Sequence, residues 1–150
     1  MVEKKKTNDV LSIEKIITAP IEEEKFSLVD VDIRYTASDV FVTVYIYGED
    51  LDIHNLEKIN KKLYPLLEEL SFLKDKLNLE VSSPGIFRKI KYFNEFFIFK
   101  NKDVRISLEK GITIEGKMKN YENNILEIID KNSSTINIKV EEIKKCYLNG

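Results

Sequence analysis

The tetrapeptide Ser82-Ser83-Pro84-Gly85 divides the sequence into two parts with different hydrophobic periods. Before it, apolar residues recur at helical spacing in two stretches and alternate with polar residues in three others, which predicts two helices and three strands. After it, short alternating runs follow at even spacing, separated by Gly, Asn and Ser, which is typical of a small all-β unit. The Pro-Gly pair itself favours a type II turn with positive φ at Gly85. The sequence therefore predicts two domains.

The first part predicts an αββαβ domain over residues 10–83, preceded by a flexible tail, residues 1–9. Pro20 is expected to bend or end the first helix and Pro65 to kink the second, while Asp52 can cap the second helix. The predicted helices and strands are, in order, residues 10–20, 28–35, 40–47, 52–70 and 77–82.

The second part predicts a hinge over residues 84–92 and a small β-barrel over residues 93–150. About 60 residues of short strands suit a closed or half-open barrel of the SH3-like or Sm-like kind better than a sandwich, which needs a longer chain. Phe93, Phe96 and Phe97 recur at helical spacing and are expected to seal one end of this barrel. The expected fold class is therefore α+β. The predicted strands are residues 103–108, 112–120, 125–131, 135–140 and 145–148.

The net charge of -2 conceals an uneven distribution along the chain. Residues 1–82 hold 11 Lys+Arg against 17 Asp+Glu, whereas residues 83–91 hold three basic residues and no acidic one. The three basic residues are Arg88, Lys89 and Lys91. We therefore expect a local phosphate contact at the hinge, and only a weak non-specific grip on nucleic acid elsewhere.

Several classes of function are disfavoured by the residues present. One cysteine and one histidine cannot form an internal disulfide or a Cys/His metal site, so no such metal site is expected. Ser82 and Ser83 lie outside any Gly-x-Ser-x-Gly elbow, which argues against a hydrolase. The longest purely apolar run, residues 96–99, is far too short to cross a bilayer. We expect a cytoplasmic binding protein without catalytic activity, membrane contact or small-molecule substrate.

The run from Leu79 to Gly85, followed after two residues by Arg88, resembles the signature of the ribosome maturation factor RimP family. The resemblance implies a non-enzymatic assembly factor for the small (30S) ribosomal subunit that holds no cofactor. It also implies binding of precursor subunits, as a monomer, through 16S rRNA and a small-subunit ribosomal protein near the decoding centre. The residues alone leave an alternative open, a free-standing RNA-binding module, because small barrels of this type often bind RNA.

The resemblance and the charge pattern together suggest a ribosome-binding site at the hinge and the start of the barrel. Five positions depart from the family pattern: Phe87 and Tyr47 each replace an Asp, Lys89 replaces a Pro, and Lys25 and Asn101 each replace a Gly. Phe87 removes a carboxylate, so any contact made by that carboxylate is not expected here. The candidate site residues are Ser82, Ser83, Pro84, Gly85, Arg88, Lys89, Lys91 and Arg105.

Overall fold

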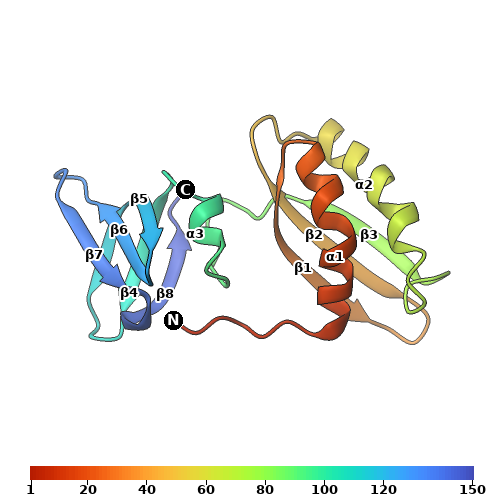
Figure 1. Cartoon of the computed structure of the whole chain (residues 1–150), viewed down its shortest axis with the longest axis horizontal. Helices are drawn as coiled ribbons and strands as arrows, with labels where there is room; N and C mark the ends of the chain where they lie inside the picture. The colour runs from red at the N-terminus through yellow and green to blue at the C-terminus, as the bar shows by residue number, and fades with distance from the viewer. The chain divides into compact units, whose positions relative to one another are not determined.

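The computed structural model describes all residues 1–150, and the chain divides into two compact units (Figure 1). The N-terminal unit is Lys6–Pro84, and the C-terminal unit is Met1–Lys5 together with Gly85–Gly150. The first five residues, which the sequence places in a flexible tail, are held on the C-terminal unit. The Met1 amino group donates to the Val140 carbonyl at 2.6 Å, and the Glu3 carboxylate accepts from the Phe93 backbone N–H at 2.7 Å.

The N-terminal unit is a three-stranded sheet in the order β1-β2-β3, and both helices lie on one face of it (Figure 1). β1 and β2 are antiparallel, whereas β2 and β3 are parallel because α2 forms the crossover between them. The predicted α+β class and the αββαβ order of this unit are confirmed. Its elements are α1 (Asn8–Glu23), β1 (Ser27–Tyr35), β2 (Val40–Tyr47), α2 (Ile53–Leu67) and β3 (Leu77–Ser82).

The core of this unit forms because both helices carry apolar residues at intervals of four, which places them on one face. On β2 the alternate residues point toward these helices, as the strand period requires. Full burial of each Ile or Leu contributes about 1.5–3 kcal/mol. The fully buried side chains are Ile13, Ile17 and Ile21 of α1, Ile59, Leu63 and Leu67 of α2, and Val42, Val44 and Ile46 of β2.

The helix ends follow from local side-chain chemistry. The Thr7 hydroxyl accepts from the Val10 N–H at 3.2 Å, and the Asp52 carboxylate accepts from the Asn55 N–H at 2.8 Å, so the predicted Asp52 cap is confirmed. α1 continues past Pro20 and α2 past Pro65, so neither proline ends its helix. No helix of the chain combines the length and the apolar character needed to cross a membrane.

α1 ends in a Schellman motif built on a non-glycine residue. Lys25 N–H donates to the Glu22 carbonyl at 3.0 Å, and Phe26 N–H donates to the Ile21 carbonyl at 3.3 Å. Lys25 has φ of 68°, the left-handed conformation that glycine adopts without steric cost. The lysine at this position therefore carries backbone strain.

The C-terminal unit is a five-stranded antiparallel sheet in the order β7-β6-β5-β4-β8. No ladder joins β7 to β8, so the sheet is open rather than closed. Its elements are α3 (Glu95–Ile98), β4 (Asp103–Leu108), β5 (Thr113–Glu122), β6 (Ile125–Ile129), β7 (Thr135–Lys139), the 3₁₀ turn Val140–Glu142, and β8 (Ile143–Leu148).

Residues 86–90, which the sequence places in the hinge, are hydrogen-bonded to the outer edge of β8. Ile90 N–H donates to the Cys146 carbonyl and Leu148 N–H to the Arg88 carbonyl, each at 2.8 Å. Gly150 N–H donates to the Ile86 carbonyl at 3.0 Å. This segment therefore belongs to the C-terminal unit and covers a strand edge that would otherwise expose its backbone groups.

The short helix α3 contains two of the three phenylalanines expected to seal the barrel, Phe96 and Phe97, and Phe93 lies just before it. The three side chains differ in burial, and Phe93 is half-buried. Phe96 is buried, whereas Phe97 remains 60% exposed. The Phe96 and Phe97 rings lie 5.0 and 5.5 Å from the Tyr121 ring on β5, measured between centroids. Tyr92 and Phe99, on either side of these residues, are both buried.

Candidate functional site

The two units carry opposite charge more strongly than the linear sequence indicates. The N-terminal unit holds 9 Lys+Arg against 16 Asp+Glu, a net charge of -7. The C-terminal unit holds 15 against 10, a net charge of +5. The difference from the sequence-based division arises because Glu3, Lys4 and Lys5, which together carry a net charge of +1, group with the C-terminal unit. An anionic partner is therefore attracted to the C-terminal unit and repelled by the other.

The predicted turn residues join the two units. Ser82 ends β3, Pro84 is the last residue of the N-terminal unit, and Gly85 is the first residue of the long part of the other unit. Gly85 has φ of 85°, which confirms the positive φ predicted for a type II turn. The Ser82 hydroxyl donates to the Ser83 carbonyl at 3.3 Å, a local contact. These residues connect the two units of the chain.

Arg88 is not an exposed phosphate ligand, so this sequence expectation is corrected. Its side chain is only 6% exposed, and its Nε donates to a carboxylate oxygen of Glu95, which is fully buried. The other Glu95 oxygen accepts from the backbone N–H groups of Lys91 and Tyr92, each at 2.9 Å. Arg88 points inward because it alternates with outward-facing neighbours on a segment that pairs with β8. It fixes the start of the C-terminal unit.

Alternation along the paired segment 86–91 decides which side chains reach solvent. Arg88 and Ile90 are buried together with Cys146 and Leu148 of β8. The residues between them face outward, since successive side chains of paired strands point to opposite faces. Lys89 is directly opposite Tyr147 in the pairing. The outward face therefore carries Lys89 and Lys91 from the segment, and Lys145, Tyr147 and Asn149 from β8 and the residue after it, while Phe87 is exposed in the turn before Lys89.

Five lysines surround one hollow of about 280 Å³ in the C-terminal unit, and we refer to it as the lysine hollow. Two of the five, Lys89 and Lys91, are predicted site residues. The other walls come from the first residues of the chain and from the start of β8. The lining residues are Met1, Val2, Lys4, Lys89, Ile90, Lys91, Lys144 and Lys145. A concentration of cationic side chains around one concavity is suited to an anion such as a phosphate.

A β-bulge lets two consecutive lysines reach this hollow. Ser107 on β4 pairs with Lys145, whereas the next residue, Leu108, pairs with Ile143, so Lys144 is the extra residue of β8. Both Lys144 and Lys145 are consequently exposed. The sequence shows both lysine runs, Lys4 to Lys6 and Lys144 to Lys145, but their convergence depends on a strand irregularity and on the docking of Met1–Lys5. Local periodicity reveals neither.

Arg105, the remaining predicted residue, does not line the lysine hollow. It lies on β4 opposite Tyr147, with Glu115 of β5 on its other side. Its Nε lies 3.8 Å from a Glu115 carboxylate oxygen, and both side chains are 60% exposed. An exposed pair of this kind contributes little to stability. Arg105 therefore shares the outward face with Lys89 and Tyr147, but its charge is partly balanced by Glu115.

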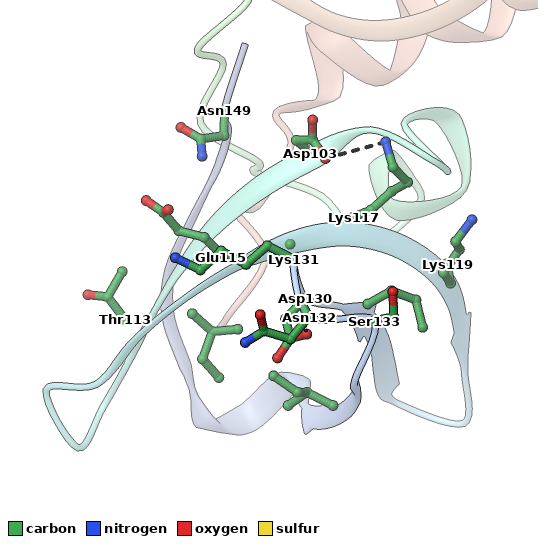
Figure 2. Close-up of a pocket in the computed structure, with 14 residues that line it drawn as sticks. Asp103, Thr113, Glu115, Lys117, Lys119, Asp130, Lys131, Asn132, Ser133 and Asn149 are labelled. Carbon is green, nitrogen blue, oxygen red and sulfur yellow. Dashed lines mark hydrogen bonds and ion pairs between the residues drawn. The ribbon is translucent and has the colours of Figure 1, made fainter.

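A wider cavity of about 810 Å³ lies elsewhere in the C-terminal unit, between β4, β5 and the turn joining β6 to β7. Figure 2 shows its polar lining, including the ion pair between Lys117 Nζ and Asp103 Oδ1 at 3.4 Å. Three acids and three lysines line it, so their charges cancel, which makes it a weaker anion site than the lysine hollow. The charged residues are Asp103, Glu115, Asp130, Lys117, Lys119 and Lys131.

The single cysteine is not positioned for chemistry. Cys146 is fully buried on β8. Burial, together with the nearby Glu95 carboxylate, raises the pKa of its thiol to about 12, so the thiolate is disfavoured at neutral pH. Across residues 1–150, no three His, Cys, Asp or Glu side chains are grouped so as to bind a metal ion.

Comparison with known proteins agrees with this architecture. Residues 16–87 match the family model described as the RimP N-terminal domain. The chain is 30% identical over 149 residues to a ribosome maturation factor RimP of Borreliella burgdorferi, and 29% identical to that of Borrelia garinii subsp. bavariensis. Each alignment covers 95% of this chain and 95% of the relative. On this evidence the chain belongs to the ribosome maturation factor RimP family.

Proposed function

We propose that this protein is a non-enzymatic assembly factor for the small (30S) ribosomal subunit, acting in the cytoplasm as a monomer and without a cofactor. Membership of the RimP family supports a role in ribosome maturation. The observation that carries the proposal is the lysine hollow, since it gives a protein of net charge -2 one concentrated anion-binding surface. The ligand of that surface would be 16S rRNA of a precursor subunit.

Phosphate binding at the lysine hollow follows from its charge and position. Lys4, Lys89, Lys144 and Lys145 are exposed, and Lys91 is half-buried beside them. Each phosphate neutralised by a lysine releases a condensed counterion, so binding should weaken as salt rises. Five lysines would give a slope of about -3.5 in log K against log salt for single-stranded RNA. That value is moderate, as expected of a factor that must leave a completed subunit.

The N-terminal unit would meet a different partner. Its net charge of -7 disfavours RNA and favours the basic segments of a small-subunit ribosomal protein, which we place near the decoding centre. With one unit for RNA and the other for protein, recognition would depend on several weak contacts. Only a particle that presents both partners would bind well.

The connection Ser82-Ser83-Pro84-Gly85 and the buried Arg88 would hold this surface in place rather than contact RNA. Arg105 would be a secondary RNA contact. We also propose that the C-terminal unit is an SH3-like or Sm-like barrel, half-open rather than closed. The return of β8 to pair with β4, the first strand of the sheet, supports this classification.

Co-sedimentation tests the proposal. The purified full-length chain is mixed with precursor and with mature small subunits, and the bound fraction is measured after centrifugation through sucrose. We expect binding to precursors and release from mature particles. Equal binding to both, or to neither, contradicts the proposal. Tight binding of the isolated protein to unrelated RNAs, stronger than to small subunits, supports a free-standing RNA-binding module instead.

A further inference from the structure

Two aromatic side chains of the C-terminal unit lie near the lysines of the outward face. Phe87 is 65% exposed, and Tyr147 is half-buried. Their chain neighbours Arg88, Cys146 and Leu148 supply the buried face, so the core does not require an aromatic residue at either outward position. An exposed aromatic ring beside cationic side chains is an arrangement that can stack a nucleic-acid base.

The strand pairing fixes how these residues lie. The hydrogen bonds Ile90 N–H to Cys146 and Leu148 N–H to Arg88 bracket the pair Lys89 and Tyr147, which makes it a non-hydrogen-bonded pair. Side chains approach most closely at such pairs. Phe87 lies two residues before Lys89, in a turn whose first residue, Ile86, accepts from the Gly150 N–H. Its ring carbon Cε1 is 3.6 Å from the position that a Cβ on Gly150 would take, so the ring lies against that glycine.

Basic side chains lie next to the two aromatic residues. Lys89 and Lys145 are shared with the lysine hollow, so the rings adjoin it directly. On β4, Arg105 is the residue opposite Tyr147. A strand of RNA lying on this face would meet aromatic surface and positive charge in alternation.

We infer that Phe87 and Tyr147 form a stacking platform for unpaired bases of single-stranded RNA, whose phosphates bind at the lysine hollow. The inference rests on the proposed function and specifies its RNA ligand as an unpaired strand. Aromatic rings stack any base through its π-face, and a basic groove beside them follows the sugar-phosphate backbone. A duplex hides the faces of its bases, so this platform discriminates against it. A net charge of +5 on the unit favours this ligand over a protein segment.

The test measures the affinity of the full-length chain for a short fluorescent oligouridylate and for a duplex RNA of equal length, at low salt. We expect tighter binding of the single strand. Phe87→Leu and Tyr147→Leu keep the apolar volume but remove the aromatic face, and each should weaken binding about tenfold. Neither changes a charge, so the salt dependence should stay as in the wild type. Phe97→Leu, an exposed aromatic of α3, is the matched control and should bind as the wild type.

Equal affinity for duplex and single strand, absence of binding to the oligouridylate, or unchanged affinity in both leucine variants overturns the platform. Loss of ribosomal-protein binding with intact RNA binding in these variants also overturns it, in favour of a protein partner. These outcomes are independent of the sedimentation experiment. If the chain binds the oligouridylate through both rings but does not bind precursor subunits, the stacking platform stands. The same result contradicts the proposed role in subunit assembly.

Discussion

Arg88 and Glu95 form a buried ion pair that joins the segment following the interdomain turn to the start of α3. The same Glu95 carboxylate accepts from two backbone N–H groups, so all of its charge is compensated by partners within the C-terminal unit. An ion pair removed from water in this way holds one conformation, because breaking it leaves a charge buried without a partner.

Arg88→Met is therefore expected to lower the free energy of unfolding of the C-terminal unit by about 3–5 kcal/mol. Adding Glu95→Gln should recover part of this loss, since the neutral amide can still accept from Lys91 and Tyr92 without an unpaired charge. Urea unfolding of the wild type, both single variants and the double variant gives the coupling energy. Additive losses in the double variant would show that the two side chains do not act as a pair.

Lys25→Gly should stabilise the N-terminal unit by about 0.5–1 kcal/mol. The left-handed conformation of Lys25 costs about 1–2 kcal/mol for a residue with a Cβ, and the greater freedom of glycine in the unfolded chain offsets part of that gain. Lys25→Ala is the control, because alanine removes the charge but keeps the strain, and its stability should stay near that of the wild type. Thermal denaturation in which the glycine and alanine variants melt together would contradict this explanation.

Gly85→Val should destabilise the chain by about 1–3 kcal/mol through backbone strain alone. No atom lies within 4 Å of the position of a Cβ at Gly85, so a clash does not contribute. Gly85→Asn should cost less, since asparagine tolerates positive φ better than a β-branched residue. If urea denaturation gives the same midpoint for both variants and the wild type, φ at this turn is not a constraint.

Ionisation of Cys146 should make stability fall at high pH. The thiol pKa is about 12 in the folded protein against 9.0 in the unfolded reference, so above about pH 9 the unfolded chain binds fewer protons than the native one. The protonated Cys146 thiol therefore makes its full contribution to the free energy of unfolding below pH 9, and this contribution is lost as the pH rises toward 12. Between pH 9 and 11, the wild type should lose more unfolding free energy than Cys146→Ala. Parallel pH profiles of the two proteins would refute the shifted pKa.

Features with a local cause could be predicted from the sequence. The stripes of α1 and α2, the Asp52 cap and the positive φ at Gly85 depend on residues within one or two turns of chain, and all are confirmed. The burial of Arg88 could not be predicted, because the pairing of residues 86–90 with β8 joins segments about 60 residues apart. The lysine hollow could not be predicted from the sequence either, since it forms only when Met1–Lys5 dock on the C-terminal unit.

The most direct test of the central claim, that the lysine hollow binds precursor subunits, compares two triple charge reversals in the same unit. One reverses Lys89, Lys144 and Lys145 to Glu, and the other reverses Lys100, Lys110 and Lys139, which are exposed but lie outside the hollow. Both change the net charge equally, and neither should unfold the protein, because exposed charges contribute little to stability.

The measurement is co-sedimentation of each variant with precursor small subunits. We predict that the variant reversed at the hollow loses at least about tenfold in affinity, because it replaces three phosphate-binding cations with repelling carboxylates. The variant reversed elsewhere should bind nearly as the wild type does. An equal loss in both variants, or wild-type binding by the variant reversed at the hollow, would contradict the account.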